Sequence, residues 1–179
     1  MWWAVDVHYV EDGCEPGARV GGLGFVSFAE ESGVERALWV PGMPQAYEPG
    51  QFYRRELPLL EAFLDDVRAA GLPVSGAIVD GFVWLGAGRP GLGEHLYTDL
   101  GASIPVIGVA KTGFSGAQGV AVPVYRGEST RPLWVTADGM EVERAARRIE
   151  GMAGAFRMPT LLKRVDRIAR EGLVDGLGA

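Results

Sequence analysis

The alternation of apolar and polar residues at the start of the chain predicts a strand with two different faces. In residues 2–10, Trp3 and Val5 fall on one face, while Asp6 and His8 share the other. This period of two is typical of a strand that packs on one side. A polar residue such as Asp6 in a largely apolar strand therefore needs a structural or functional explanation.

Two further strands follow with short connections. Residues 19–28 contain Gly21, Gly22 and Gly24, and glycine inside a strand indicates a bend or the close approach of another segment. Residues 34–40 are again rich in apolar and β-branched positions. Three consecutive strands with short turns favour an antiparallel meander.

The middle of the chain predicts a parallel unit. Residues 51–70 have apolar positions at helical spacing, with Pro58 expected to bend the helix or to mark its first turn. The runs 73–80 and 104–109 are unbroken apolar segments, which indicates strands buried on both faces, and a short helix near 94–100 separates them. Two such strands joined through a helix are parallel by default.

The remaining elements complete an α/β fold. We expect a hairpin from 120–125 and 133–136 and two helices near 141–152 and 159–171. Strands grouped first and strand–helix–strand units later predict a mixed sheet, an antiparallel meander plus parallel strands, flanked by helices. We interpret residues 1–173 as a single domain and residues 174–179 as a flexible tail.

Composition narrows the class of protein. A net charge of −6 over 179 residues argues against a non-specific nucleic-acid coat. Residues 144–170 nevertheless hold eight basic residues against two acidic ones, so this stretch either faces phosphates or forms a solvated helix face. The lone Cys14 allows no internal disulfide and no cysteine zinc site.

The sequence contains neither a membrane span nor a signal-like N-terminus. No apolar run is long enough to cross a bilayer, and the first ten residues lack a basic region and include Asp6. We therefore expect a cytoplasmic protein with no membrane partner, and we favour a monomer.

The strand at 73–80 ends in a carboxylate, Asp80, followed by Gly81. One interpretation is a simple turn, because Asp-Gly is a common turn dipeptide. The other is a functional site, because α/β sheets place ligands at the carboxyl ends of their strands. Asp6 on a neighbouring strand and Glu56 on the intervening helix could join Asp80, and three carboxylates without cysteine suit Mg²⁺ or Mn²⁺ rather than zinc.

Several short segments resemble one family. They are residues 47–50 (YEPG), 55–58 (RELP), Asp6 within AVDVHY, Asp80-Gly81, and 107–111 (IGVAK), with Gly91 and His95 after the second aspartate. In this order they are similar to landmarks of endonuclease V, the deoxyinosine 3′ endonuclease. The resemblance runs from about residue 4 to 111, with a weaker echo at 156–159.

The resemblance implies a ribonuclease H-like fold and a metal-dependent endonuclease. It would cut a phosphodiester 3′ to a deaminated purine (inosine) in DNA or RNA, which is a DNA-repair activity. Asp6, Glu56 and Asp80 would bind Mg²⁺, or Mn²⁺, and Lys111 would contact the scissile phosphate.

The same resemblance implies how the substrate is held. The substrate-binding residues would be Tyr47 and Pro49 in a strand-separating wedge, Gly50, Gly81 and Gly108 around the base, and Arg89 and His95. A stiff loop that carries an aromatic residue suits such a wedge.

The chain departs from the family pattern after the second aspartate. Where the family has histidine–proline–arginine–arginine, this chain has residues 86–89 (GAGR), so a histidine is missing and Arg89 remains. A histidine expected near the last strand is also missing around 138–140. His8 is a candidate to compensate, or else an ordinary polar residue at a strand end.

Two alternatives stay open. A descendant of the nuclease that binds nucleic acid without cutting it fits the missing histidine. Gly86, Gly88 and Gly91 also satisfy the dinucleotide fingerprint G-x-G-x-x-G, although Pro90 interrupts the loop and the strand has already ended at Asp80.

Overall fold

The computed structural model describes residues 1–10, 15–42 and 51–173. Its strands are β1 (Trp2–Val10), β2 (Gly17–Phe25), β3 (Val34–Pro41), β4 (Gly76–Asp80), β5 (Trp84–Gly86), β6 (Arg89–Pro90), β7 (Val106–Ala110), β8 (Val122–Val124) and β9 (Leu133–Asp138). Its helices are α1 (Phe52–Ala69), α2 (Leu92–Asp99), α3 (Val142–Glu150) and α4 (Thr160–Glu171), with a short 3₁₀ turn η1 (Ser115–Ala117).

Seven strands form one mixed sheet in the order β3-β2-β1-β4-β7-β9-β8. The meander β1-β2-β3 is antiparallel, whereas β4 pairs in parallel with β1 on one side and β7 on the other. The β8-β9 hairpin closes the far edge through an antiparallel pairing with β7. The predicted mixed α/β fold is thus confirmed, and β4, which ends in Asp80, is its central strand.

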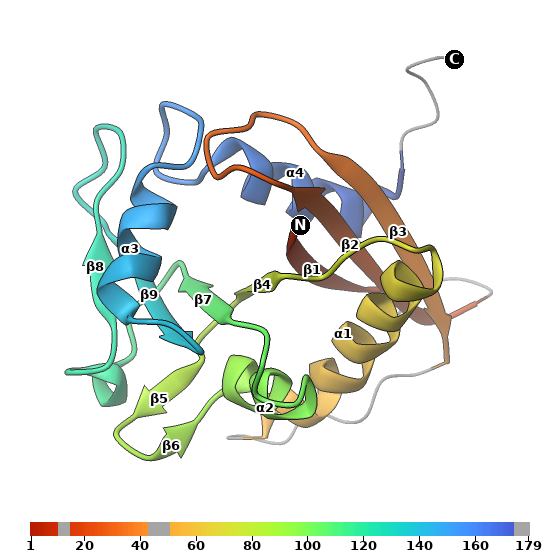
Figure 1. Ribbon diagram of the computed structural model, residues 1–179, viewed down its shortest axis with the longest axis horizontal. Coiled ribbons are helices and arrows are strands. Elements are labelled where there is room, and N and C mark those ends of the chain that lie inside the picture. The colour runs from red at the N-terminus through yellow and green to blue at the C-terminus, as the bar shows by residue number, and fades with distance from the viewer. Residues whose placement is uncertain (11–14, 43–50, 174–179) are drawn as a thin grey trace.

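Helices cover both faces of this sheet (Figure 1). One core joins α3 and α4 to the face that carries Ala4, Ile78 and Ile107. The other joins α1 and α2 to the face that carries Trp3, Val5 and Val79. The alternation predicted for β1 is therefore confirmed: neighbouring residues enter opposite cores, and the strand is buried on both sides up to Val5.

The glycine-rich segment after Asp80 differs from the open loop that its sequence suggests. Trp84 and Gly86 pair with Pro90 and Arg89 in a two-stranded hairpin beside α2. The hairpin packs on η1, because a Cβ atom at Gly86 would lie 2.7 Å from the carbonyl oxygen of Gly116. Gly88, with a φ of +67°, allows the tight turn of the hairpin, and Gly86 allows the close contact with η1.

Two smaller expectations need correction. Pro58 does not mark the start of α1, because the helix begins at Phe52 and continues through the proline. Strand β2 ends at Phe25 rather than at residue 28, since Glu30 accepts hydrogen bonds from the backbone N–H groups of Val26 and Ser27 and closes a turn.

In the parts of the chain that the structure describes, no helix combines the length and the apolar character needed to cross a membrane. Cys14 and the segment 174–179 lie outside the described residues.

Candidate active site

The two strand aspartates stand at the point where the central strands separate. The parallel pairing of β1 with β4 ends at Val5 and Val79, so the next residues on the two strands are Asp6 and Asp80. Exposure changes at the same place, since Val79 is buried and Asp80 is exposed. Both side chains lie at the carboxyl edge of the parallel strands, where α/β sheets bind ligands.

Glu56 reaches this edge from the other layer. Helix α1 lies on one face of the sheet, and its N-terminal turns are at the end of the sheet where β1 and β4 finish. Glu56 belongs to the second turn of this helix. The apolar stripe of Leu59, Leu60 and Phe63 holds the helix against the sheet. Carboxylates from three separate elements thus line one cavity at this edge of the sheet.

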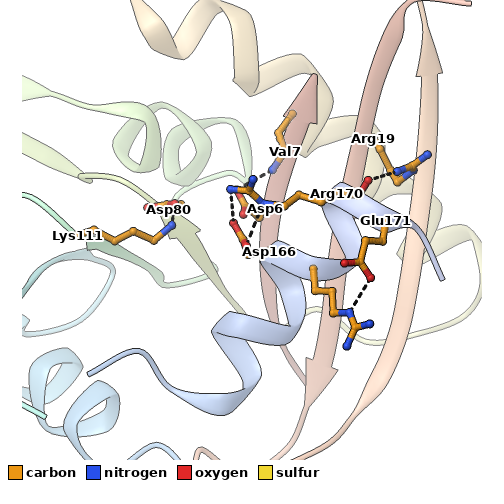
Figure 2. Close-up of polar contacts among 9 residues, drawn as sticks. Asp6, Val7, Arg19, Asp80, Lys111, Asp166, Arg170 and Glu171 are labelled. Atoms are coloured by element: carbon orange, nitrogen blue, oxygen red, sulfur yellow. Dashed lines mark hydrogen bonds and ion pairs between the residues drawn. The ribbon is translucent and has the colours of Figure 1, made fainter. Parts of the chain in front are cut away.

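A small cavity of about 210 Å³ lies among these groups. It is lined by Asp6, Val7, His8, Glu56, Asp80, Lys111, Asp166, Ala169 and Arg170. Figure 2 shows Lys111 and Asp80 to one side of Asp6, with Asp166 and the end of the Arg170 side chain next to Asp6. We call this space the carboxylate cavity.

The carboxylate cavity carries more negative charge than its basic groups neutralise. Burial and the repulsion of Asp80 raise the pKa of Asp6 to about 6, although the N–H of Val7 donates a hydrogen bond of 2.9 Å to it. Burial, followed by repulsion from Asp6 and Asp80, raises the pKa of Glu56 to about 8. Such shifts mark groups that a cation would stabilise in their charged form.

Lys111 supplies a positive charge at the end of β7. Its ammonium nitrogen lies 2.8 Å from Oδ2 of Asp80. Burial is the largest single effect and lowers the pKa of Lys111, but the hydrogen bond to Asp80 and the nearby carboxylate charges together outweigh it and keep this pKa above its usual value. Arg157 donates a hydrogen bond to the backbone carbonyl of Lys111, which ties the strand end to the C-terminal part of the chain.

Asp166 and Arg170 join the site without having been predicted. They lie one turn apart on α4, and Arg170 Nε is 3.1 Å from Asp166 Oδ2. The helix reaches the site because Gly21 of β2, which pairs with Asp6, leaves room for it: a Cβ atom there would lie 2.4 Å from the backbone nitrogen of Ala169. The glycines of β2 were the sequence signal for this close approach.

Gly81 and Gly108 lie against each other beside the cavity. Gly81 has a φ of +125°, which favours glycine. A Cβ atom at Gly108 would lie 2.6 Å from the carbonyl oxygen of Gly81 and 2.7 Å from the nitrogen of Val83. Val83 N–H donates to the hydroxyl of Thr136 at 2.8 Å, which fixes the turn after Asp80. The turn after Asp80 therefore packs directly on the buried Gly108, and open space lies beside the α-carbon of Gly81.

The other predicted substrate residues do not line the carboxylate cavity. Arg89 lies on the hairpin with its guanidinium 5.6 Å from the ring centroid of Phe114. His95 on α2 stacks on Tyr53, with ring centroids 3.8 Å apart. Tyr47, Pro49 and Gly50 lie outside the described residues.

The structure bears on the two positions at which this chain lacks a histidine of the family pattern, near Gly86 and at residues 138–140. Gly86 has a φ of +152° and its hydrogen atoms face the carbonyl of Gly116, so a side chain there is disfavoured. Asp138 pairs with Val106 at the start of β7, at the far end of the sheet from Asp80. Residues 138–140, where this chain lacks the second histidine of the family pattern, lie away from the carboxylates, because β9 runs antiparallel to β7 and ends at the opposite edge of the sheet. His8 does line the carboxylate cavity.

Four of the eight basic residues at 144–170 make the contacts described here within the fold. Arg164 forms a two-pronged ion pair with Glu35, and Arg148 lies 5.0 Å from the ring centroids of both Trp2 and Phe28. Together with the contacts of Arg157 and Arg170, these pairs attach the C-terminal helices to the sheet. The stretch is thus a packing surface more than a phosphate-binding face.

The oxygen ligands around the carboxylate cavity suit a hard divalent cation. Across the described ranges, no three His, Cys, Asp or Glu side chains are already grouped as ligands of one ion. The ammonium group of Lys111 holds one oxygen of Asp80, and a cation would compete with it for that oxygen. The raised pKa values of Asp6 and Glu56 are the feature that fits such an ion, because a bound cation would stabilise the ionised form of both carboxyl groups.

Neither a protein-family model nor a curated protein matches this chain, whereas solved structures do. Endonuclease V of Ciona intestinalis, in complex with a DNA containing an inosine followed by a ribo-adenosine, has a TM-score of 0.76 and 18% identity over 96% of this chain and 84% of that one. The Bacillus subtilis enzyme has a TM-score of 0.75 and 19% identity over 94% and 78%, respectively.

Endonuclease V of Streptomyces avermitilis is similar, with a TM-score of 0.69 and 25% identity over 96% of this chain and 80% of that one. These likenesses extend through the C-terminal elements, well beyond the segments that carry the sequence motifs. The predicted resemblance to endonuclease V is thereby confirmed, at low sequence identity and over most of the chain.

Proposed function

We propose that the protein is a divalent-metal-dependent endonuclease of the endonuclease V type, acting on DNA or RNA that contains a deaminated purine. The observation that carries this proposal is the convergence of Asp6, Glu56 and Asp80 with Lys111 around one cavity. The charge of that cavity, the strand-end location and the structural likeness to endonuclease V all support it.

In this proposal Asp6, Glu56 and Asp80 hold Mg²⁺ or Mn²⁺. The bound ion supplies Lewis acidity and charge compensation for phosphodiester hydrolysis. Lys111 pairs with an oxygen of the scissile phosphate, which requires its ammonium group to turn from Asp80. Asp166 adds a fourth carboxylate at the opposite wall, and Arg170 limits its charge.

The proposed substrate contacts lie around this centre. The purine would meet backbone at Gly81 and Gly108, with Gly50 completing the pocket, and Tyr47 and Pro49 would part the strands. Arg89 and His95 would contact the nucleic acid outside the carboxylate cavity. Arg89 and Phe114 form an exposed pair, in which the guanidinium would bind a phosphate and the ring would stack on a base.

A non-cutting nucleic-acid-binding protein is the second candidate. The ion pair between Lys111 and Asp80 favours it, because it occupies a proposed metal ligand. Dinucleotide binding has less support, since Gly86 and Gly88 belong to a hairpin rather than to a strand–loop–helix turn.

The test is cleavage of an oligonucleotide that contains one inosine, as DNA and as RNA, with Mg²⁺ or Mn²⁺. We expect Asp80→Asn to lower the rate by roughly 10³-fold or more, because the ion's contribution of several kcal/mol is lost. Asp138→Asn is the matched control: it also ends a strand, at the other edge, where it accepts a hydrogen bond from Gly139 that asparagine can keep.

The alternatives give different results in the same assay. Binding without cleavage in either ion would establish the non-cutting protein. Equal rates for Asp80→Asn and Asp138→Asn would place the chemistry elsewhere. Binding of NAD, with no binding of nucleic acid, would favour the dinucleotide interpretation.

A further inference from the structure

A second and larger cavity of about 870 Å³ adjoins the carboxylate cavity. The two share Asp6, Asp80, Lys111 and Asp166 on their linings. The larger one, which we call the side cleft, extends between the sheet, α4 and residues 155–158. A molecule bound at the carboxylates therefore continues directly into it.

The inner part of the side cleft is lined by apolar side chains. Ile78 and Val109 of the sheet face Leu162 and Val165 of α4 across it, and Met158 contributes a further apolar side chain. Its volume lies in the range of about 300–1,000 Å³ that is usual for sites of small organic groups. Walls of this kind suit a flat, weakly polar group such as a nucleobase.

The mouth of the cleft is charged and aromatic. The two lysines of the chain, Lys111 and Lys163, both line it. Lys163 Nζ lies 4.5 Å from the ring centroid of Phe156, whose side chain is 68% exposed. A cation beside an exposed ring is the combination that binds phosphate and stacks bases in single strands. Glu128 also lines the cleft and disfavours a phosphate deep inside it.

The outer wall of the cleft is held in place by a buried arginine. Arg126, 6% exposed, donates hydrogen bonds to the backbone carbonyls of Glu150 (3.2 Å), Gly154 (3.0 Å) and Phe156 (3.0 Å), and also to that of Met152. The wall segment is therefore fixed before any ligand binds. Such preorganisation lowers the entropic cost of binding.

We propose that the side cleft receives the base and sugar of a nucleotide next to the scissile phosphate. A phosphate at Lys111 has one nucleoside on either side. The turn at Gly81 packs on Gly108, on the sheet face opposite Ile107 and Val109, so a purine at Gly81 leaves the α4 face, where the side cleft opens, to a nucleoside that flanks this phosphate. This inference rests on the proposed nuclease function and adds a second unstacked base to it.

The experiment measures binding rather than turnover, with Ca²⁺ replacing Mg²⁺. A set of single-stranded oligonucleotides carries one inosine and one abasic nucleotide, which is moved along the strand. We expect affinity to fall roughly 5- to 150-fold when the abasic position adjoins the scissile phosphate, the range for losing one stacked base. Leu162→Trp, which fills the cleft, abolishes this difference.

Two further variants keep the test decisive. Met158→Trp fills the same cleft from the wall segment, so it replaces Leu162→Trp if the helix variant does not fold. Val26→Trp adds the same ring at an exposed turn beyond the end of β2, away from the cleft, and retains the wild-type preference.

The outcomes separate the two hypotheses. If abasic positions next to the cut cost no affinity, or both cleft-filling variants keep the wild-type preference, the inference is wrong while inosine cleavage stands on its own. If the preference is present but no oligonucleotide is cut with Mg²⁺ or Mn²⁺, the cleft is a base site and the nuclease proposal fails. Absence of all nucleic-acid binding overturns both.

Discussion

The two walls that face each other across the site are built in different ways. Asp6 and Asp80 emerge from paired strands at the centre of a seven-stranded sheet, so their positions depend on many backbone hydrogen bonds. The opposite wall, residues 151–158, has bends and turns but no helix or strand, and the side chain of Arg126 bonds its carbonyls. One wall depends on the backbone hydrogen bonds of a sheet, whereas arginine side chains hold much of the other: Arg126 bonds its carbonyl groups, and Arg157 bonds the carbonyl groups of Lys111 and Pro132.

The charges of these walls also differ. Burial, followed by repulsion among the carboxylates, raises the pKa of Asp6 and Glu56, and a bound cation would stabilise their ionised forms. Burial lowers the pKa of Arg126, whose charge is solvated by backbone carbonyls in place of water. The carboxylate wall therefore suits a charged ligand. In the wall formed by residues 151–158, the charge of Arg126 is already paired with backbone carbonyl groups. Substitutions should therefore affect chemistry on one side and stability on the other.

The largest expected effect on stability comes from Arg126→Met. This change leaves several carbonyl groups without a donor, at about 1–3 kcal/mol for each that water cannot reach. We expect the free energy of unfolding to fall by ~3 kcal/mol, or ~6–12 °C in Tm for a chain of this size. Urea denaturation measures it. The exposed Arg131→Met is the control, and a loss below ~1 kcal/mol would show that the wall does not depend on this arginine.

Asp166 of α4 lies between the two walls, since it lines both the carboxylate cavity and the side cleft. We expect Asp166→Asn to lower the cleavage rate ~10- to 100-fold, as for groups that support a metal site, with partial recovery at high Mg²⁺. The matched control is Asp65→Asn, another helical aspartate paired with an arginine, at 3.1 Å. An unchanged Mg²⁺ dependence would limit Asp166 to holding Arg170.

The strand carboxylates could be predicted from sequence because their signal is local. An apolar run ending in Asp80 and an alternating strand containing Asp6 each indicate where a side chain points, and the parallel pairing follows from the order of elements. The motif around Glu56 added the third carboxylate by resemblance. These residues need no knowledge of how distant helices pack.

Asp166 could not be predicted in the same way. Its place depends on the depth at which α4 packs on β2, which Gly21 determines through contact with Ala169. The sequence indicated a close approach at Gly21 without saying which segment approaches. The β5-β6 hairpin was missed for a related reason, because its glycines read equally as a flexible loop and as a tight turn.

The pH dependence of stability probes the carboxylate wall directly. Glu56 has a folded pKa of about 8 against an ordinary value of 4.5. The folded state therefore binds more protons between these values, and stability in EDTA falls as pH rises from about 5 to 8. Glu56→Gln removes the contribution of Glu56 to this slope, so its stability relative to wild type rises between pH 5 and pH 8, by at most ~1.4 kcal/mol per pH unit.

Thermal unfolding between pH 5 and 9, with and without Mg²⁺, measures this effect. If Glu56 belongs to a metal site, Mg²⁺ at pH 8 stabilises wild type more than Glu56→Gln, because the ion binds the ionised carboxylate. The exposed Glu143→Gln on α3 should follow wild type throughout. Parallel pH profiles for Glu56→Gln and wild type would mean that Glu56 is not held in its protonated form by the crowding of Asp6 and Asp80, and the contrast between the two walls would lose its electrostatic basis.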